Sequence, residues 1–101
     1  MERDFDSFDE GVARWRETPG AVLLDVRTPE EYAQGHVPGS VNFSLERLRL
    51  YEGDLDAKVF AYCRSGSRSA RACALLEAQD YDAVNLGGII AYTGEIARGE
   101  A

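Results

Sequence analysis

Residues 58–76, KVFAYCRSGSRSARACALL, combine the features that decide the fold. The apolar run KVFAY ends at Cys63 and predicts a buried strand, and the alanine-rich segment from about Ser67 to Ala78 predicts a helix. Between the two, RSGSR supplies a glycine and two arginines, and Arg71 follows inside the predicted helix. A strand, a short glycine-containing loop and a helix in this order are typical of α/β domains with parallel strands.

Short apolar segments elsewhere in the chain predict the rest of the sheet, which we expect to have about five strands. Besides KVFAY, these segments are a short one at Phe5, AVLLDV (21–26), VNF (41–43) and DAVNL (82–86). We expect a single domain over residues 1–101, with a core at about 5–92 and three α/β/α layers around a small, mostly parallel sheet. The last segment, GGIIAYTGEIARGE (87–100), predicts a glycine-broken turn into a final helical piece.

Capping patterns predict where the helices begin. SFDE (7–10) reads as a capping box for a helix to about Trp15, and TPEE (28–31) as a second box for a short helix that Gly35 ends. A serine cap is expected to start a further helix in SLERLRLY (44–51), with leucines on one face.

The amino-acid composition limits which binding partners and which cellular compartment we expect for this protein. The net charge of −7 argues against nucleic acid and anionic membranes, because both require a basic face. No apolar stretch approaches the length of a membrane span, and the acidic start MERDFDSFDE lacks the apolar region of a signal peptide. Two cysteines do not form a disulfide framework, so we expect a cytoplasmic protein.

Cys63 is the candidate nucleophile. Ligands of open parallel sheets bind beyond the carboxyl ends of the strands, where this cysteine is expected to lie. The loop RSGSR leads into a helix N-terminus, whose free N–H groups and nearby cations can lower a cysteine pKa to about 3.5–7.5. Arg64 and Arg68 would then stabilise the thiolate and attract an anionic substrate.

These segments resemble the rhodanese family of sulfurtransferases. LLDVRTPEEYAQGHVPGSVNFSL (23–45) is similar to the family's first signature, and CRSGSRS (63–69) to its active loop. The similarity continues through residue 92. It implies a single-domain, rhodanese-like sulfurtransferase in which Cys63 carries sulfur as a persulfide held by loop N–H groups, with no metal or organic cofactor.

The resemblance also implies the substrates and the residues that bind them. A small anionic donor such as thiosulfate would pass its outer sulfur to Cys63, and cyanide, glutathione or a protein thiol would accept it. The expected binding residues form the loop itself: Arg64, Ser65, Gly66, Ser67 and Arg68. Ser69, at the helix start, is either a pocket hydroxyl or a cap.

Two other functions remain open. Related phosphatases and arsenate reductases have a loop that is one residue longer, whereas Cys63 to Arg68 spans six residues and Ser69 stands where that loop would require arginine. The short loop therefore favours sulfur transfer. The other alternative is a relay module that hands the persulfide to a partner protein.

Other polar residues have both structural and functional interpretations. Asp25 and Arg27 could line the pocket, but the resemblance favours a structural network beneath the loops. His36 could pair with the cysteine, but it matches the family's turn histidine, which orders loops. One histidine and two separated cysteines do not form a usual zinc site. Cys73, imagined as a resolving thiol, lies too far along the helix and is expected in the core.

Two features stay undecided. Arg71 could join the anion site or face solvent on its helix. Many relatives have an extra residue within the NL-GG segment and a tryptophan near its end, whereas this chain reads NLGG (85–88) and has Tyr92 near the aromatic position. We expect Gly87 and Gly88 still to let this turn approach the active loop closely.

Overall fold

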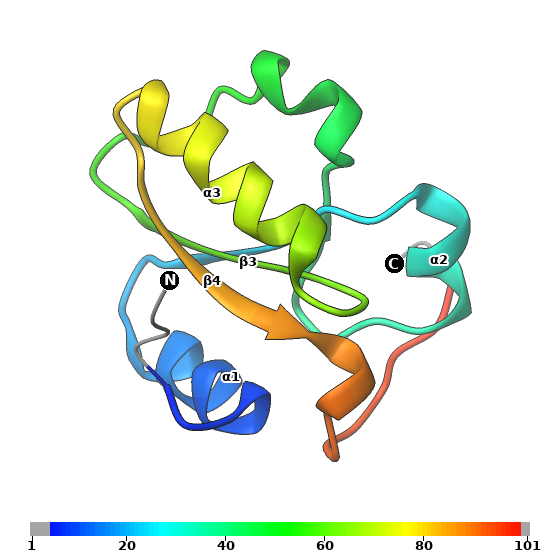
Figure 1. The fold of residues 1–101 in the computed structure, drawn as a ribbon. Helices are drawn as coiled ribbons and strands as arrows, with labels where there is room; N and C mark the ends of the chain where they lie inside the picture. Colours follow the sequence, from blue (N-terminus) through cyan, green and yellow to red (C-terminus); the bar gives the residue numbers. More distant parts are fainter. Residues whose placement is uncertain (1–4, 100–101) are drawn as a thin grey trace.

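The computed structural model describes residues 5–99 and shows a four-stranded parallel sheet between layers of helices (Figure 1). The strands lie in the order β2-β1-β3-β4, with β1 at Val22–Asp25, β2 at Val41–Asn42, β3 at Lys58–Cys63 and β4 at Asp82–Gly88. Neighbouring strands all pair in parallel, as the connections through helices allow. The predicted α/β/α architecture is confirmed.

Helices cover both faces of this sheet. They are α1 at Phe8–Glu17, α2 at Pro29–Gln34, η1 at Leu45–Leu50, α3 at Ser67–Ala78 and η2 at Ile89–Ala91. Figure 1 shows α1 on one side of the sheet and α3 with η1 on the other, while α2 and η2 lie towards the end of the sheet to which the β4 arrow points. The bounds of α3 agree with the sequence prediction.

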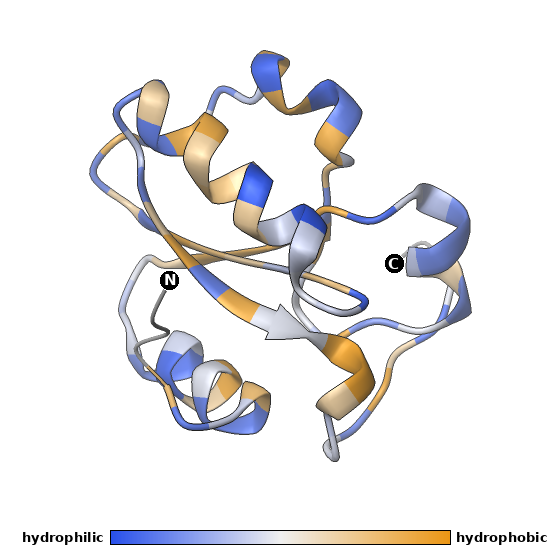
Figure 2. Cartoon of the chain, viewed as in Figure 1, coloured by the Kyte–Doolittle hydropathy of each residue, from blue (hydrophilic) through white to orange (hydrophobic). Residues whose placement is uncertain are grey.

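The core has two apolar layers because successive side chains of a strand point to opposite faces of the sheet. Val59 and Ala61 of β3 pack in the layer that includes Leu76 of α3, whereas Phe60 packs with Phe8 of α1. This explains the unbroken apolar runs of the central strands, which are buried on both faces. Hydrophobic residues accordingly run along the strands, while α2 is mostly hydrophilic (Figure 2).

The two predicted capping boxes differ in the structure. At α2 the box is complete: the Glu31 N–H donates to the Thr28 hydroxyl, and the Glu31 carboxylate accepts from the Thr28 N–H. At α1 the Ser7 hydroxyl accepts from the Glu10 N–H at 3.1 Å, but the Glu10 carboxylate accepts from the N–H of Asp6 instead of Ser7. Only half of that box forms.

Two predictions about elements were wrong, and a third was confirmed only in part. The strand expected at Phe5 does not form; this side chain packs in the core as part of a bend, so the sheet has four strands. The segment after Ser44 is a 3₁₀ helix, and the serine makes no side-chain capping bond. Beyond Gly88 the helical piece is the single turn η2, and the chain then runs irregularly until Ala97 bridges to His36.

Candidate active site

Cys63 lies at the carboxyl end of β3, as predicted, where the chain's path through the sheet changes direction. The connection from β1 leads outward to β2, and the next strand, β3, pairs on the opposite side of β1. Open α/β sheets bind ligands at such a switch point. The side chain has no exposed surface in this state, because the loop that follows covers it.

Hydrogen-bond donors converge on the sulfur atom of Cys63. The Gly66 N–H donates to Sγ at 2.9 Å, and the N–H and hydroxyl of Ser69 approach it at 3.4 Å each. Gly66 has φ +108°, a left-handed conformation that disfavours any side chain, and this turn directs the loop amides inward.

These donors favour the thiolate. Burial raises the pKa of the Cys63 thiol, but the hydrogen bonds from Ser69, Gly66 and Ser65 outweigh burial and lower the pKa below its usual value. The sequence predicts this lowered pKa, but with nearby arginines as part of its cause. Among the described residues, no arginine side chain donates to Sγ, and backbone amides do so instead. The Ser69 hydroxyl lies 3.4 Å from Sγ, and its single proton has a shorter hydrogen bond to Asn85 at 2.6 Å.

The end of β4 packs directly against the active loop. A Cβ atom on Gly88 would lie 2.2 Å from the carbonyl oxygen of Arg64 and 2.5 Å from Cα of Ser65, so this contact requires glycine. The N–H of Ile90 then donates to the Arg64 carbonyl at 3.2 Å. The expectation that the shortened NLGG segment still approaches the loop closely is confirmed.

Asn85 is a site residue that the sequence analysis missed. Its Oδ1 accepts from the Ser69 hydroxyl at 2.6 Å and from the Gly87 N–H at 2.9 Å, and its Nδ2 donates to the Gly66 carbonyl at 3.3 Å. Asn85 thus connects β4, the loop and the first turn of α3. The only signal in the sequence was the asparagine of NLGG, because the contact depends on packing between segments far apart in the chain.

Removing the Ser69 hydroxyl tests its effect on the nucleophile. We expect Ser69→Ala to raise the pKa of Cys63, because the thiolate loses the polar hydroxyl that lies 3.4 Å from Sγ. The measurement is the pH dependence of iodoacetamide alkylation, whose midpoint should move to higher pH. Ser69→Thr keeps the hydroxyl and should keep the midpoint near that of the wild type. An unchanged midpoint in Ser69→Ala would contradict this role.

The Arg68 guanidinium forms an ion pair with Glu31 of α2, so it is not free to bind an anion in the loop. The guanidinium donates to both Glu31 oxygens, at 2.7 and 3.0 Å. Hydrogen bonds from Arg68 are the main cause that lowers the pKa of Glu31 to about 2. Glu31 therefore joins the active loop to α2 in addition to the capping that the sequence predicted. Arg64, by contrast, is exposed.

Asp25, Arg27 and His36 are buried, and each makes hydrogen bonds. The Arg27 guanidinium donates to the Asp25 carboxylate at 2.6 and 2.9 Å and to the Gly35 carbonyl at 2.7 Å, all in buried or partly buried surroundings. His36 Nδ1 donates to the Tyr32 carbonyl at 2.7 Å, and its ring stacks on the Tyr32 ring. The structural role of the three residues stays a prediction.

Cys73 packs in the core layer under α3, as expected. Burial raises the pKa of its thiol to about 12, so it is a poor nucleophile. Both cysteines are free thiols.

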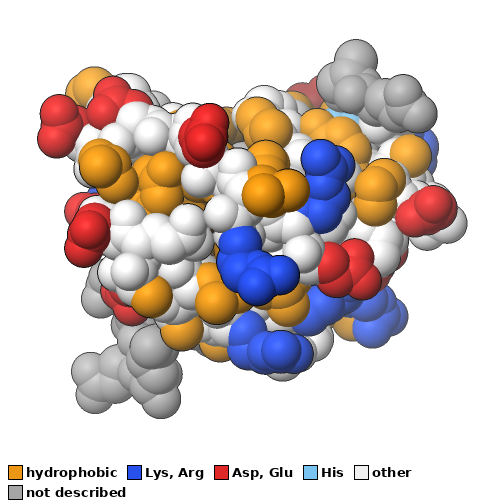
Figure 3. All heavy atoms as spheres, turned by 90° about the horizontal axis from the view of Figure 1, so that it is seen from above, with side chains coloured by type: hydrophobic (Ala, Val, Ile, Leu, Met, Phe, Trp, Pro, Cys, Tyr) orange, Lys and Arg blue, Asp and Glu red, His pale blue; other side chains and the backbone are white. Residues whose placement is uncertain are grey.

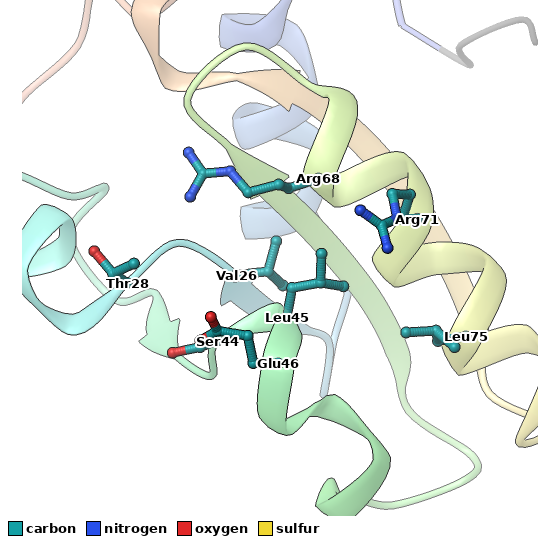
Figure 4. A pocket seen from close by; sticks show the side chains of 8 residues that line it. All are labelled: Val26, Thr28, Ser44, Leu45, Glu46, Arg68, Arg71 and Leu75. Atoms are coloured by element: carbon teal, nitrogen blue, oxygen red, sulfur yellow. The ribbon is translucent and has the colours of Figure 1, made fainter.

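Arg71 faces a cavity of about 350 Å³ beside the active loop (Figure 4). Its lining consists of Val26, Thr28, Ser44, Leu45, Glu46, Arg68, Arg71 and Leu75.

Metal sites and membrane-spanning helices can be assessed over residues 5–99. No group of three or more His, Cys, Asp or Glu side chains within residues 5–99 is placed to hold a metal ion. No helix in the same range has both the length and the apolar character that crossing a membrane requires.

The fold and site define an α/β domain that presents a cysteine at a parallel sheet's switch point, cradled by the amides of a short loop. The family model described as "Rhodanese-like domain" matches residues 9–95. The chain therefore belongs to the rhodanese family.

Individual relatives agree. The chain is 42% identical over 95 residues to a protein named sulfurtransferase from Allochromatium vinosum, covering 90% of this chain and 86% of the relative. It is 34% identical over 90 residues to the thiosulfate sulfurtransferase GlpE of Pseudomonas entomophila, covering 81% and 83%. A crystal structure of a rhodanese-like domain protein from Staphylococcus aureus has a TM-score of 0.80 at 30% identity, with 91% of this chain and 94% of that chain covered.

Proposed function

We propose that the chain is a sulfurtransferase that moves sulfane sulfur from thiosulfate, or a related anionic donor, through a persulfide on Cys63. The observation that carries the proposal is the set of donors around Sγ: two backbone N–H groups and the Ser69 hydroxyl lie within 3.4 Å. Such a cradle stabilises a thiolate, and it would equally stabilise the negative charge of a persulfide. The names of the relatives support the same class of reaction.

In the first step, the Cys63 thiolate attacks the outer sulfur of thiosulfate. A new S–S bond forms to Sγ, the S–S bond of thiosulfate breaks, and sulfite leaves with the bonding pair. A thiolate needs no general base, and the hydrogen bonds that lower the pKa of Cys63 favour that ionised form. Cys63 is fully buried, so the loop over residues 64–68 must move aside to admit the donor.

The exposed face of the loop supplies the donor's binding groups in this proposal. Arg64, Ser65 and Ser67 are all exposed, and Arg64 is the cation nearest in sequence to the nucleophile. Figure 3 looks onto the side that carries α3 and η1, where Lys and Arg side chains gather beside hydrophobic ones although the net charge is −7. A local cationic surface attracts an anion even on an acidic protein.

In the second step, an acceptor anion attacks the outer sulfur of the persulfide. The S–S bond to Sγ breaks and Cys63 leaves as a thiolate, which restores the enzyme. With cyanide as acceptor, the product is thiocyanate. With a thiolate as acceptor, the product is the persulfide of that thiol. The free thiols of both cysteines support placing this cycle in the reducing cytoplasm.

The length of the loop supports sulfur over phosphate chemistry. The span from Cys63 to Arg68 is six residues, one fewer than in the related phosphatases and arsenate reductases, and Ser69 stands where their longer loop would require arginine.

Intact mass spectrometry before and after thiosulfate, and again after cyanide, tests the proposal. We expect a gain of one sulfur atom that maps to the Cys63 peptide, followed by its loss with release of thiocyanate. No gain with thiosulfate would reject this donor. Activity with aryl phosphate or arsenate in its place would favour the phosphatase or reductase alternative.

A further inference from the structure

The Ser69 hydroxyl lies between two acceptors and has a single proton. Its oxygen is 2.6 Å from Oδ1 of Asn85 and 3.4 Å from Sγ of Cys63. Sulfur is larger than oxygen, so both atoms are within reach, but a serine hydroxyl has one proton to donate. The distance to Oδ1 is that of a short O–H···O hydrogen bond. With the loop closed, Asn85 therefore accepts the proton.

The side-chain amide of Asn85 has one orientation, because two backbone groups fix it. The Gly87 N–H donates to Oδ1 at 2.9 Å, and Nδ2 donates to the Gly66 carbonyl at 3.3 Å. Exchanging the oxygen and the nitrogen would place donor against donor and acceptor against acceptor. Oδ1 therefore faces Ser69 as an acceptor.

The protein itself supplies the other acceptors of this proton, because Ser69 is fully buried. The backbone carbonyls of Gly66 and Gly87 lie 3.1 and 3.4 Å from the hydroxyl oxygen, and both are neutral. Sγ of Cys63 is the acceptor near this hydroxyl that gains a negative charge. Hydrogen bonds to a charged acceptor are stronger than neutral ones, so ionised sulfur is the main competitor of Asn85.

The two steps of sulfur transfer require opposite properties of the Cys63 sulfur. A thiolate becomes a weaker nucleophile as its pKa falls, but it becomes a better leaving group. A donor permanently bonded to Sγ would assist the second step and slow the first. A proton that Asn85 holds and can release assists the second step without this cost.

We propose that Asn85 is a positioning residue that competes with Cys63 for the proton of the Ser69 hydroxyl. While Cys63 is the nucleophile, Asn85 holds this proton and the backbone amides bind Sγ. When an acceptor attacks the outer sulfur of the persulfide, the S–S bond to Sγ breaks and the bonding pair stays on Sγ. The hydroxyl then turns from Oδ1 to donate to Sγ, and no covalent bond of Ser69 changes. The role in this second step rests on the proposed function.

The pH dependence of iodoacetamide alkylation, mapped to the Cys63 peptide, tests the competition without any sulfur transfer. We expect Asn85→Ala to move the midpoint to lower pH, because the thiolate loses its competitor for the proton. At a pH below the wild-type midpoint, alkylation should become about threefold faster. Asn85→Leu removes the same polar atoms but keeps the side chain's volume, so it should shift the midpoint in the same direction. Asn85→Asp keeps the acceptor and adds a negative charge, and should move the midpoint to higher pH.

Two further variants control this measurement. In the Ser69→Ala background, Asn85→Ala should no longer lower the midpoint, since the shared proton is gone. Asn42→Ala removes another asparagine at a strand end, whose Nδ2 donates to the carbonyls of Asp25 and Arg27, and should keep the wild-type midpoint.

None of the Asn85, Ser69 and Asn42 variants removes a charged group near the loop. Arg68 interacts with the charge of Cys63, and Glu31 of α2 and Asp25 of β1 act on Arg68. Arg64, beside Cys63 in the chain, is exposed. All four groups stay in place throughout the series.

A purely structural role for Asn85 predicts the opposite sign. A loosened loop would withdraw the amides from Sγ and move the midpoint to higher pH in Asn85→Ala and Asn85→Leu as well. That result, an unchanged midpoint, or equal shifts with and without the Ser69 hydroxyl would overturn the proposal.

Single-turnover kinetics test the second step. The persulfide enzyme is prepared with thiosulfate, freed of donor and mixed with cyanide, and thiocyanate release is followed. We expect release to be about threefold faster in Asn85→Ala and slower in Ser69→Ala. Equal rates in all three proteins would reject the role in the second step. If the wild type forms no persulfide, the proposed function fails, whereas the alkylation result still decides the competition for the proton.

Discussion

Cys63→Ser is expected to lose sulfurtransferase activity by at least about a thousandfold, because a serine hydroxyl forms no persulfide and is not ionised near neutral pH. The substitution is nearly isosteric, and the donors from Gly66 and Ser69 can still bond an oxygen at this position. We therefore expect the variant to fold. The measurement is thiocyanate formation from thiosulfate and cyanide, together with the intact mass after thiosulfate.

Cys73→Ala is the matched control for this experiment. Cys73 is also buried, but it packs under α3 in the core and its pKa is raised to about 12. We expect wild-type activity and a loss of about 1 kcal/mol in the free energy of unfolding. Full activity in Cys63→Ser, or equal losses in both variants, would contradict the assignment of the nucleophile.

Asp25→Ala is expected to destabilise the protein by about 3–5 kcal/mol, because it leaves the Arg27 guanidinium buried without its charge partner. Asp25 is 0% exposed and Arg27 is 6% exposed, and hydrogen bonds of 2.6 and 2.9 Å join their side chains. Breaking one member of such a pair costs far more than the pair itself contributes. The measurement is urea denaturation, which small single domains usually follow as a two-state transition.

The ion pair between Lys58 and Asp82 provides the control for burial. Its atoms lie 3.9 Å apart, and the two side chains are 37% and 67% exposed. Because solvent screens such a pair, Asp82→Ala should change the free energy of unfolding by no more than about 1 kcal/mol. If Asp25→Ala and Asp82→Ala lowered the free energy of unfolding by similar amounts, burial would not increase the contribution of the Asp25–Arg27 pair to stability.

The sequence was most informative where structure depends on neighbours along the chain. Runs buried on both faces predicted β1 and β3, and α3 was predicted to its observed bounds. The TPEE box predicted the start of α2, since a cap is a contact across three residues. The position of Cys63 at a strand end followed from the same local pattern.

Local pattern failed where tertiary packing competes with it. Phe5 has the apolar character of a strand residue, but it fills the layer under α1 instead of extending the sheet. The segment of η1 has leucines at helical spacing, yet it forms a 3₁₀ helix whose Ser44 makes no capping bond. Nothing within these short stretches specifies which of the two outcomes the surrounding core will favour.

By itself, then, the sequence determined the parallel α/β arrangement and the position of Cys63 at the end of β3, in front of the loop that leads into α3, because periodicity, caps and glycines act over a few residues. The tertiary structure alone decided which groups meet that loop. It brought Asn85 to Ser69, across 16 positions, and Glu31 to Arg68, across 37. It also brought Arg71 of α3 and Glu46 of η1 to the lining of one cavity. Contacts at such separations depend on the order of the strands and on how closely the glycines let them approach, and local pattern specifies neither.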